Sequence, residues 1–294
     1  MKSHYITVNN VKLHYVTGGQ EDGPVCVLLH GFPQSWITWR NVIPYLETHY
    51  KIIAVDLRGY GDSDKPEGTE NYTNKIMAED IAEILHAQNV TNAYVVGHDR
   101  GARVARRLAY DNPELINRLA LIEIMPMEYV YSLSAAEAAK KYWHWVFQVV
   151  ADLPETLISG KEEEYLKFLL SRGDGLFERL NSDGSWDKYL AHWKQPGAVK
   201  AALSDYRASY KFDLSEYQEK IESADKLNIN TLLLWAEKGN LSGLPVEEIW
   251  QQSINNVTGY ELKNCGHYLL EEIGEEVAQY ILEFDDKKIS IFKR

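Results

Sequence analysis

Cysteine is scarce in this sequence: only Cys26 and Cys265 occur, with no Cys-x-x-Cys pair and no Cys/His spacing typical of metal ligands. We therefore expect neither a disulfide framework nor a structural zinc site. No run of about 18 apolar residues could span a bilayer, and the first residues, Met1-Lys2-Ser3-His4-Tyr5, lack the apolar stretch of a secretory signal. These absences predict a soluble, cytoplasmic protein without a membrane partner.

Positive charge is also in short supply. The chain has 31 Lys and Arg against 43 Asp and Glu, which gives a net charge of −12. Nucleic acid held by general electrostatic attraction is therefore not an expected partner, and any bound anion must meet a local cluster of cations. No internal repeat or low-complexity linker is visible, and 294 residues with 45% hydrophobic content suit an ordinary globular protein.

Short apolar, β-branched runs alternate with segments of helical apolar spacing in the first part of the chain. The strand-like runs cover residues 25–29, 51–55, 93–96 and 119–124, and the helical segments cover 75–89 and 100–110. Strands that are separated by helices predict a mostly parallel sheet with helices on both of its faces.

The middle of the chain has a different character. From about residue 126 to 225 no buried-strand run appears and aromatic residues are dense, whereas strand patterns return at 231–235 and, weakly, at 260–262. We expect an α/β core formed by residues 1–125 and 226–294, with residues 126–225 inserted as a helical cap over the strand ends.

A strand, a sharp turn and a helix are predicted around Asp99. The segment reads Val95-Val96-Gly97-His98-Asp99-Arg100-Gly101-Ala102, a nucleophile elbow with Asp where Ser is more common. The glycines permit a strained turn that presents the middle side chain at a helix N-terminus. An Asp in that place can displace a leaving group from carbon and form an ester that water then cleaves. A simple helix N-cap is the alternative role.

Four motifs occur in the order typical of the α/β-hydrolase family: His30-Gly31-Phe32-Pro33, Asp56 to Ser63, the Asp99 elbow, and Cys265-Gly266-His267. Over nearly the whole chain the sequence resembles the branch of epoxide hydrolases and dehalogenases, in particular the fluoroacetate (haloacetate) dehalogenases. The resemblance implies that His267 is the general base and that the backbone N–H groups of Phe32 and Arg100 form the oxyanion hole.

The acid that orients the base departs from the common pattern. Many relatives carry Asp after the strand that ends here at Trp235, but this sequence has Ala236-Glu237-Lys238-Gly239, with Gly in the Asp position. The other place used in the family follows residues 119–122, where Glu123 stands and haloacetate dehalogenases carry Asp. We expect Glu123 to complete the triad, with Glu237 as the alternative.

Arg100 and Arg103 are three residues apart, so a helix would place them on one face beside Asp99. Planar guanidinium groups suit a carboxylate, and the Asp-Arg-Gly-Ala-Arg sequence is similar to that of fluoroacetate dehalogenases, in which two arginines hold the substrate carboxylate. We expect Arg100 and Arg103 to bind the substrate carboxylate. Salt bridges to acidic groups of the cap are the alternative.

By the same resemblance, a halide site lies in the cap. His144 and Trp145, within Tyr142 to Phe147, match adjacent His and Trp donors, and Tyr206 in Asp205-Tyr206-Arg207 matches a third donor. Three neutral N–H and O–H groups could stabilise a leaving halide. Epoxide hydrolases instead use a tyrosine from each half of the cap, and Tyr206 with Tyr142 could supply that pair.

The sequence as a whole predicts hydrolytic dehalogenation of short 2-haloacids, fluoroacetate or chloroacetate to glycolate and halide, through a covalent Asp99 ester. This chemistry requires no cofactor and no metal. A small molecule is the expected partner, and the resemblance also suggests a homodimer. The alternatives are an epoxide hydrolase with the same Asp99 and His267, and a ligand-binding protein of the hydrolase fold.

Overall fold

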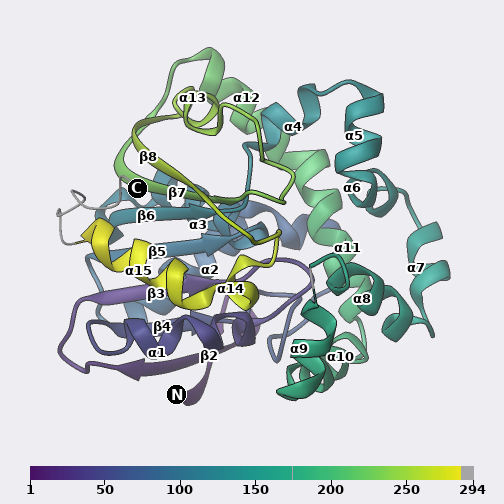
Figure 1. Cartoon of the computed structure of the whole chain (residues 1–294), viewed down its shortest axis with the longest axis horizontal. Helices are drawn as coiled ribbons and strands as arrows, with labels where there is room; N and C mark the ends of the chain where they lie inside the picture. The colour runs from purple at the N-terminus through teal and green to yellow at the C-terminus, as the bar shows by residue number, and fades with distance from the viewer. Residues whose placement is uncertain (174, 286–294) are drawn as a thin grey trace.

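A computed structural model of the chain describes residues 1–173 and 175–285 (Figure 1). Within these residues, eight strands form one sheet of order β1-β2-β4-β3-β5-β6-β7-β8. The strands are β1 (Lys2–Val8), β2 (Val11–Gly19), β3 (Val25–Leu29), β4 (Lys51–Val55), β5 (Ala93–His98), β6 (Ile116–Ile122), β7 (Leu227–Ala236) and β8 (Ile254–Leu262). The β1–β2 and β2–β4 pairs are antiparallel, and the other five pairs are parallel.

Helices cover both faces of this sheet, which confirms the expected fold class. They are α1 (Ile43–Leu46), α2 (Asn74–Ala87), α3 (Arg100–Asp111), α13 (Val246–Trp250), α14 (Leu269–Glu272) and α15 (Gly274–Asp285), with 3₁₀ turns η1 (Trp36–Asn41), η2 (Thr69–Tyr72) and η3 (Pro113–Leu115). Ile81 and Val104, of α2 and α3, pack on one face with Val95, and Ile281 of α15 packs on the other with Val96. Successive strand residues point to opposite faces, so burial of both faces explains the unbroken apolar runs.

The N-terminal hairpin of β1 and β2 was not predicted. The β1 strand lies at the edge of the sheet and most of its side chains are exposed or half-buried, so it lacks an apolar run. Its turn is made by Asn9 and Asn10, both with positive φ (50° and 62°), the backbone conformation that tight hairpin turns favour. The Asn-Asn pair is a local signal for this turn.

Between β6 and β7 the described residues of 126–225, which we call the cap, are helical. The helices are α4 (Met127–Ser132), α5 (Ala135–Lys141), α6 (Trp143–Gln148), α7 (Leu153–Ile158), α8 (Glu162–Leu170), α9 (Leu176–Ser182), α10 (Ser185–Trp193), α11 (Ala198–Ala208), the π-helical turn η4 (Ser209–Asp213) and α12 (Leu214–Glu222). Figure 1 shows α5 to α11 gathered at one end of the sheet. Trp193 Nε1 donates a hydrogen bond to the Pro33 carbonyl oxygen (2.8 Å), which fixes the cap against the loop after β3. The domain boundaries predicted above stay a prediction.

None of the helices in the described ranges combines the length and apolarity needed to cross a membrane. The cytoplasmic location stays a prediction.

Candidate active site

The turn between β5 and α3 presents Asp99. Its backbone has φ 48° and ψ −116°, a strained conformation for a non-glycine residue. A side chain at Gly101 would overlap the carbonyl oxygens of Leu29 and His30, so only glycine lets α3 begin this close to β3. The strain and the close packing support a functional reason for the position of Asp99.

Backbone donors hold the Asp99 carboxylate. The Phe32 N–H donates to Oδ1 at 3.0 Å, and the Arg100 N–H also bonds this side chain. Burial raises the pKa of Asp99, but the charges of His267 and Arg100 outweigh burial, so the net pKa lies below its ordinary value. Asp99 is therefore an ionised carboxylate at neutral pH, with two N–H groups where an oxyanion hole requires them.

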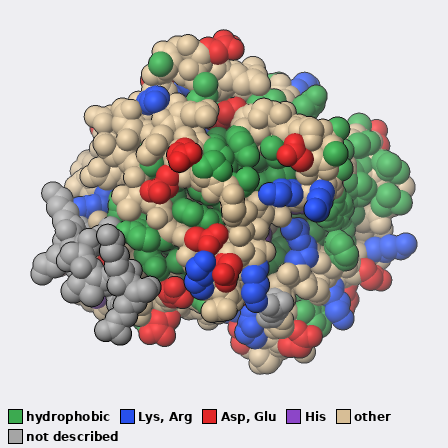
Figure 2. Space-filling view, turned by 45° about the horizontal axis from the view of Figure 1, so that its top comes forward, with side chains coloured by type: hydrophobic (Ala, Val, Ile, Leu, Met, Phe, Trp, Pro, Cys, Tyr) green, Lys and Arg blue, Asp and Glu red, His purple; other side chains and the backbone are tan. Residues whose placement is uncertain are grey.

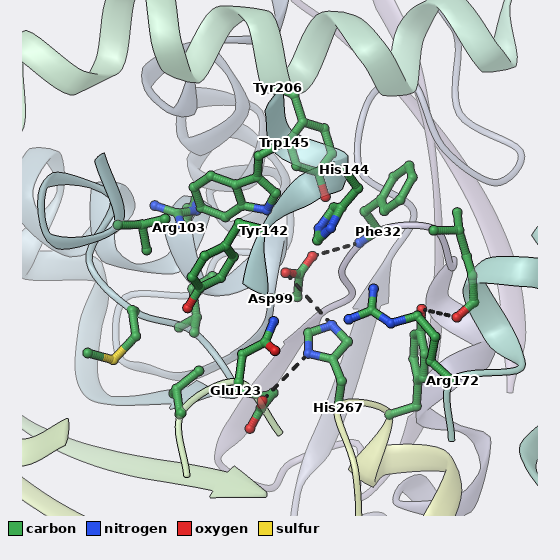
Figure 3. A pocket seen from close by; sticks show the side chains of 17 residues that line it. Phe32, Asp99, Arg103, Glu123, Tyr142, His144, Trp145, Arg172, Tyr206 and His267 are labelled. Carbon is green, nitrogen blue, oxygen red and sulfur yellow. Dashed lines mark hydrogen bonds and ion pairs between the residues drawn. The ribbon is translucent and has the colours of Figure 1, made fainter. Parts of the chain in front are cut away.

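His267 lies between Asp99 and Glu123 (Figure 3). Its Nε2 is 3.9 Å from Asp99 Oδ2, and its Nδ1 is 3.8 Å from Glu123 Oε1. Both separations exceed a hydrogen bond, as is common for catalytic groups without substrate. His98 Nε2 donates to the His267 carbonyl oxygen at 2.9 Å, because that oxygen can only accept. The loop of His267 is thereby tied to the end of β5.

Glu123 follows β6 and is fully buried beside the base. Its Oε2 accepts from the Ala236 N–H at 2.8 Å, and no described residue forms a hydrogen bond with its Oε1, the oxygen that lies 3.8 Å from His267 Nδ1. A Cβ at Gly239 would overlap Oε1. Glycine at that position, where many relatives carry Asp, thus provides the room that the longer Glu123 side chain needs.

The alternative acid, Glu237, is directed elsewhere. Its carboxylate accepts from the Asn264 N–H at 3.0 Å and lies 3.4 Å from Lys263 Nζ. The structure therefore brings Glu123, and not Glu237, to His267.

The two arginines of α3 have different surroundings, and the role of Arg100 in binding a carboxylate stays a prediction. Its guanidinium is paired with Asp205 of α11 and also bonds the Asp205 carbonyl oxygen at 2.9 Å. Burial acts to lower the pKa of Arg100, but the carboxylate of Asp205 raises this pKa, so that it lies well above its ordinary value. Arg100 does not line the pocket around Asp99. Arg100 Nε and Nη2 already bond Asp205, a residue of the cap. The structure therefore fits the alternative role, a salt bridge to the cap.

Arg103 lines that pocket and is 4% exposed. Among the described residues no group accepts a hydrogen bond from its Nε or Nη2, and its guanidinium lies over the Trp145 ring, 4.7 Å from the centroid. Burial, followed by the charge of Arg100, lowers the pKa of Arg103. This is a buried cation with unused donors, an arrangement that is costly without an anion.

The three expected halide donors come together above Asp99 (Figure 3). The ring centroid of Tyr206 lies 6.0 Å from those of His144 and Trp145, and all three residues line the pocket. Burial, and then the charge of Arg172, lowers the pKa of His144 to about 3, so its ring is neutral near pH 7. His144 Nδ1 has no partner among the described residues. A neutral ring carries one N–H, as a halide donor requires.

The pocket is small, with a volume of about 30 Å³. A single water needs roughly 10–15 Å³ on this measure, so the space suits a ligand of a few heavy atoms. Sequence reasoning missed two polar lining residues, Arg172 and Asn240, because neither belongs to a recognisable motif. Tyr142 also lines the pocket, and no described residue forms a hydrogen bond with its hydroxyl. Burial, and then the charge of Glu123, raises the pKa of that hydroxyl well above its ordinary value.

Among the described residues, one cluster of side chains has the composition and spacing of a possible metal site, and it consists of His14, Asp56 and Asp62. His14 Nδ1 is hydrogen-bonded to Asp56 Oδ2 at 2.7 Å and its Nε2 to Ser3 Oγ at 2.8 Å. The same Asp56 oxygen accepts from the Asp62 N–H at 3.0 Å. These bonds use the atoms that would ligate a metal, so the group serves to hold the loop after β4.

Residues 24–272 match the family model of the alpha/beta hydrolase fold. The chain belongs to this family. A fluoroacetate dehalogenase of a Burkholderia species is 30% identical to this α/β hydrolase, over 95% of this chain and 92% of the relative. A soluble epoxide hydrolase of Corynebacterium sp. (strain C12) is 32% identical and covers 96% of each chain. The crystal structure of ALR0039 from Nostoc sp PCC 7120 superposes with a TM-score of 0.90 at 36% identity, covering 96% of this chain and 97% of that one.

These relatives place this α/β hydrolase in the branch of dehalogenases and epoxide hydrolases. The same branch was expected from the motifs, and the expectation is confirmed. The identities do not separate the two activities, since a dehalogenase and an epoxide hydrolase match over similar lengths. The choice between them depends on the chemistry of the pocket.

Proposed function

We propose that this α/β hydrolase hydrolyses short 2-haloacids, fluoroacetate or chloroacetate, to glycolate and halide. The observation that carries the proposal is Arg103: a buried guanidinium that lines the pocket with two donors unused. A carboxylate ligand would supply the missing charge and accept both hydrogen bonds. Neutral ligands would leave that cation uncompensated.

In the first step Asp99 attacks the halogen-bearing carbon. The Phe32 N–H holds Oδ1, which leaves Oδ2 to form the new C–O bond. The carbon–halogen bond breaks and the halide leaves with the electron pair toward the donors of His144, Trp145 and Tyr206. Arg103 holds the substrate carboxylate during the displacement, so the carbon stays aligned with Oδ2.

In the second step His267 takes a proton from water, and the resulting hydroxide attacks Cγ of the ester. Negative charge then develops on the oxygen facing the Phe32 and Arg100 N–H groups. The Cγ–O bond breaks, glycolate leaves with the Asp99 oxygen and takes the proton back from His267, and the Asp99 carboxyl group that remains loses its proton to solvent. Glu123 stabilises the imidazolium that exists between the two transfers. No cofactor or metal takes part in either step.

The size of the pocket supports a small substrate. About 30 Å³ corresponds to on the order of two or three water positions, which suits a two-carbon acid better than a large epoxide.

Epoxide hydrolysis is the second candidate, and one observation favours it. Asp205 occupies the Arg100 fork, so a single arginine remains on α3 to hold a carboxylate. The Tyr206 hydroxyl is directed toward Asp99 in Figure 3 and could protonate an opening ring, with His144 or Tyr142 as the second donor.

The experiment that separates the candidates is halide release from fluoroacetate and chloroacetate by the purified protein, with the Asp99→Asn variant as the blank. Release that the variant abolishes supports the proposal. If neither acid releases halide while glycidol or styrene oxide is hydrolysed, epoxide hydrolysis replaces dehalogenation as the proposed function. A ligand that stabilises the protein without turnover of either class would favour a binding protein.

We also propose that two copies of the chain associate through the cap. Large apolar side chains are exposed there, and Figure 2 shows them gathered at the cap end of the molecule. They are Val146, Val150, Leu153, Leu157 and Phe168, each between 44% and 58% exposed. Patches of this kind mark protein contacts. Sedimentation equilibrium should give a dimer, and Leu153→Glu with Leu157→Glu should give a folded monomer; a monomeric wild type would contradict the proposal.

A further inference from the structure

Arg172 is a second cation that faces the pocket, and it comes from the cap. It belongs to the short connection between α8 and α9 and lines the same cavity as Asp99 and Arg103. In Figure 3 its guanidinium is directed into the pocket from the side opposite Arg103. Among the residues that the structure describes, no carboxylate lies within ion-pair distance of it.

Two contacts of its chain neighbours hold the backbone on either side of Arg172 against the loop of His267. The Tyr268 hydroxyl, next to His267, donates to the Leu169 carbonyl oxygen at the end of α8 (3.1 Å). Gly173 is buried against Glu272, whose Oε2 accepts from the Gly266 N–H at 3.0 Å. The turn that carries Arg172 is thus attached on both sides to the loop of His267. An exposed arginine ordinarily extends into solvent, so this anchoring favours a role at the pocket.

The net charge of the chain gives a reason for a second cation such as Arg172 at the pocket. The chain carries a net charge of −12, which repels anions from most of its surface. Arg100, the expected second carboxylate ligand, is committed to Asp205. An anion at Asp99 therefore meets Arg103 on one side, and the only other cation lining the pocket, within the described ranges, is Arg172.

We propose that Arg172 is the second anion-binding residue of the pocket and determines its preference for short carboxylate-bearing substrates over neutral ones of the same size. The inference rests on the proposed function, because it assigns the anion to the Asp99 pocket. It differs from that function in placing half of the recognition on the cap, outside the α3 pair.

The test is equilibrium binding measured by calorimetry in the Asp99→Asn background, where no turnover consumes the ligand. Chloroacetate is the anionic probe and chloroacetamide is its neutral counterpart. The variants are Arg172→Gln, Arg172→Lys, and Lys188→Gln as a matched loss of one exposed positive charge away from the pocket. Halide release by the wild type is assayed separately.

Arg172→Gln should raise the Kd for chloroacetate roughly tenfold, as expected for losing a partly solvated charged contact. The Kd for chloroacetamide should stay within twofold. Arg172→Lys should recover part of the loss, and Lys188→Gln should have no effect. An unchanged chloroacetate Kd, an equal loss for both probes, or no detectable chloroacetate binding would each overturn the inference. Absence of halide release with intact, Arg172-dependent binding would instead overturn only the proposed function.

Discussion

Replacing Arg103 by Met should raise stability while it removes activity. The guanidinium is buried, and among the described residues its Nε and Nη2 have no hydrogen-bond partner and no carboxylate forms a direct ion pair with it. Methionine has a similar length and can pack on Trp145, the ring over which Arg103 now lies. The substitution therefore removes an uncompensated charge from the interior and leaves little empty space.

The expected change in stability follows from the hydrogen bonds that Arg103 Nε and Nη2 do not make with described residues. Each buried donor without a partner costs about 1–3 kcal/mol, so the two donors together cost about 2–6 kcal/mol. Loss of the cation–π contact with Trp145 offsets about 1–2 kcal/mol of that gain. The net change is a stabilisation of up to about 5 kcal/mol, and for a chain of this size each kcal/mol raises Tm by about 2 °C. Two lost charged hydrogen bonds to substrate should cost about 3 kcal/mol, or roughly a hundredfold in kcat/KM.

Arg106 supplies the matched control, since it lies one turn further along α3 and is also buried. Its Nη1 and Nη2 donate to Glu128 at 3.1 and 2.8 Å, although its Nε has no acceptor in the described part of the chain. Arg106→Met leaves Glu128 unpaired and should lower stability by about 2–4 kcal/mol. Thermal unfolding and urea titration of both variants, with kcat/KM for chloroacetate, measure the effects. Equal destabilisation of the two variants would refute the reasoning, because Arg103 would then be an ordinary structural residue.

Two further predictions concern the acid and the halide site. Gly239→Ala should displace the Glu123 carboxylate from His267 and slow ester hydrolysis at least tenfold. Glu123→Asp in the same background has a side chain one methylene shorter and should restore part of the rate. Stopped-flow measurements that show no such rescue would contradict the steric explanation. His144 stays neutral in the folded protein down to about pH 3, but the unfolded chain protonates it below about pH 6.5. Stability should therefore fall as the pH drops from 6.5, by up to about 1.4 kcal/mol per pH unit from this residue. His144→Gln should flatten that slope between pH 6 and 4, whereas a substitution at exposed His86 should not; equal slopes for His144→Gln and wild type would remove the argument for a neutral donor.

The places of Asp99 and His267 in one pocket could be predicted because the motifs that carry them are local. The elbow needs glycines at fixed offsets from Asp99, and the base follows a short Gly-His motif, so both appear in a single stretch of sequence. The structure brings both residues to one pocket, with Glu123 beside them. The core strands were equally visible, because burial on both faces demands unbroken apolar runs.

What could not be predicted depends on contacts between distant parts of the chain. Arg100 and Arg103 look alike on α3, and only Asp205, which lies 105 positions further along, separates their roles. Arg172 carries no motif, and its place in the pocket depends on how the α8–α9 turn packs against the loop of His267. Gly239 could be read as a missing Asp, but the room that it provides for Glu123 is evident only in three dimensions.

The most direct test of the account is the mass of the His267→Gln variant after incubation with chloroacetate. Without its base the enzyme should complete the displacement but not the hydrolysis, so the intact mass should increase by one carboxymethyl group, and peptide mapping should place that group on Asp99. The Asp99→Asn, His267→Gln double variant should show no increase. If the wild type releases chloride while the single variant remains unmodified, or carries the group on another residue, the aspartyl-ester mechanism is contradicted.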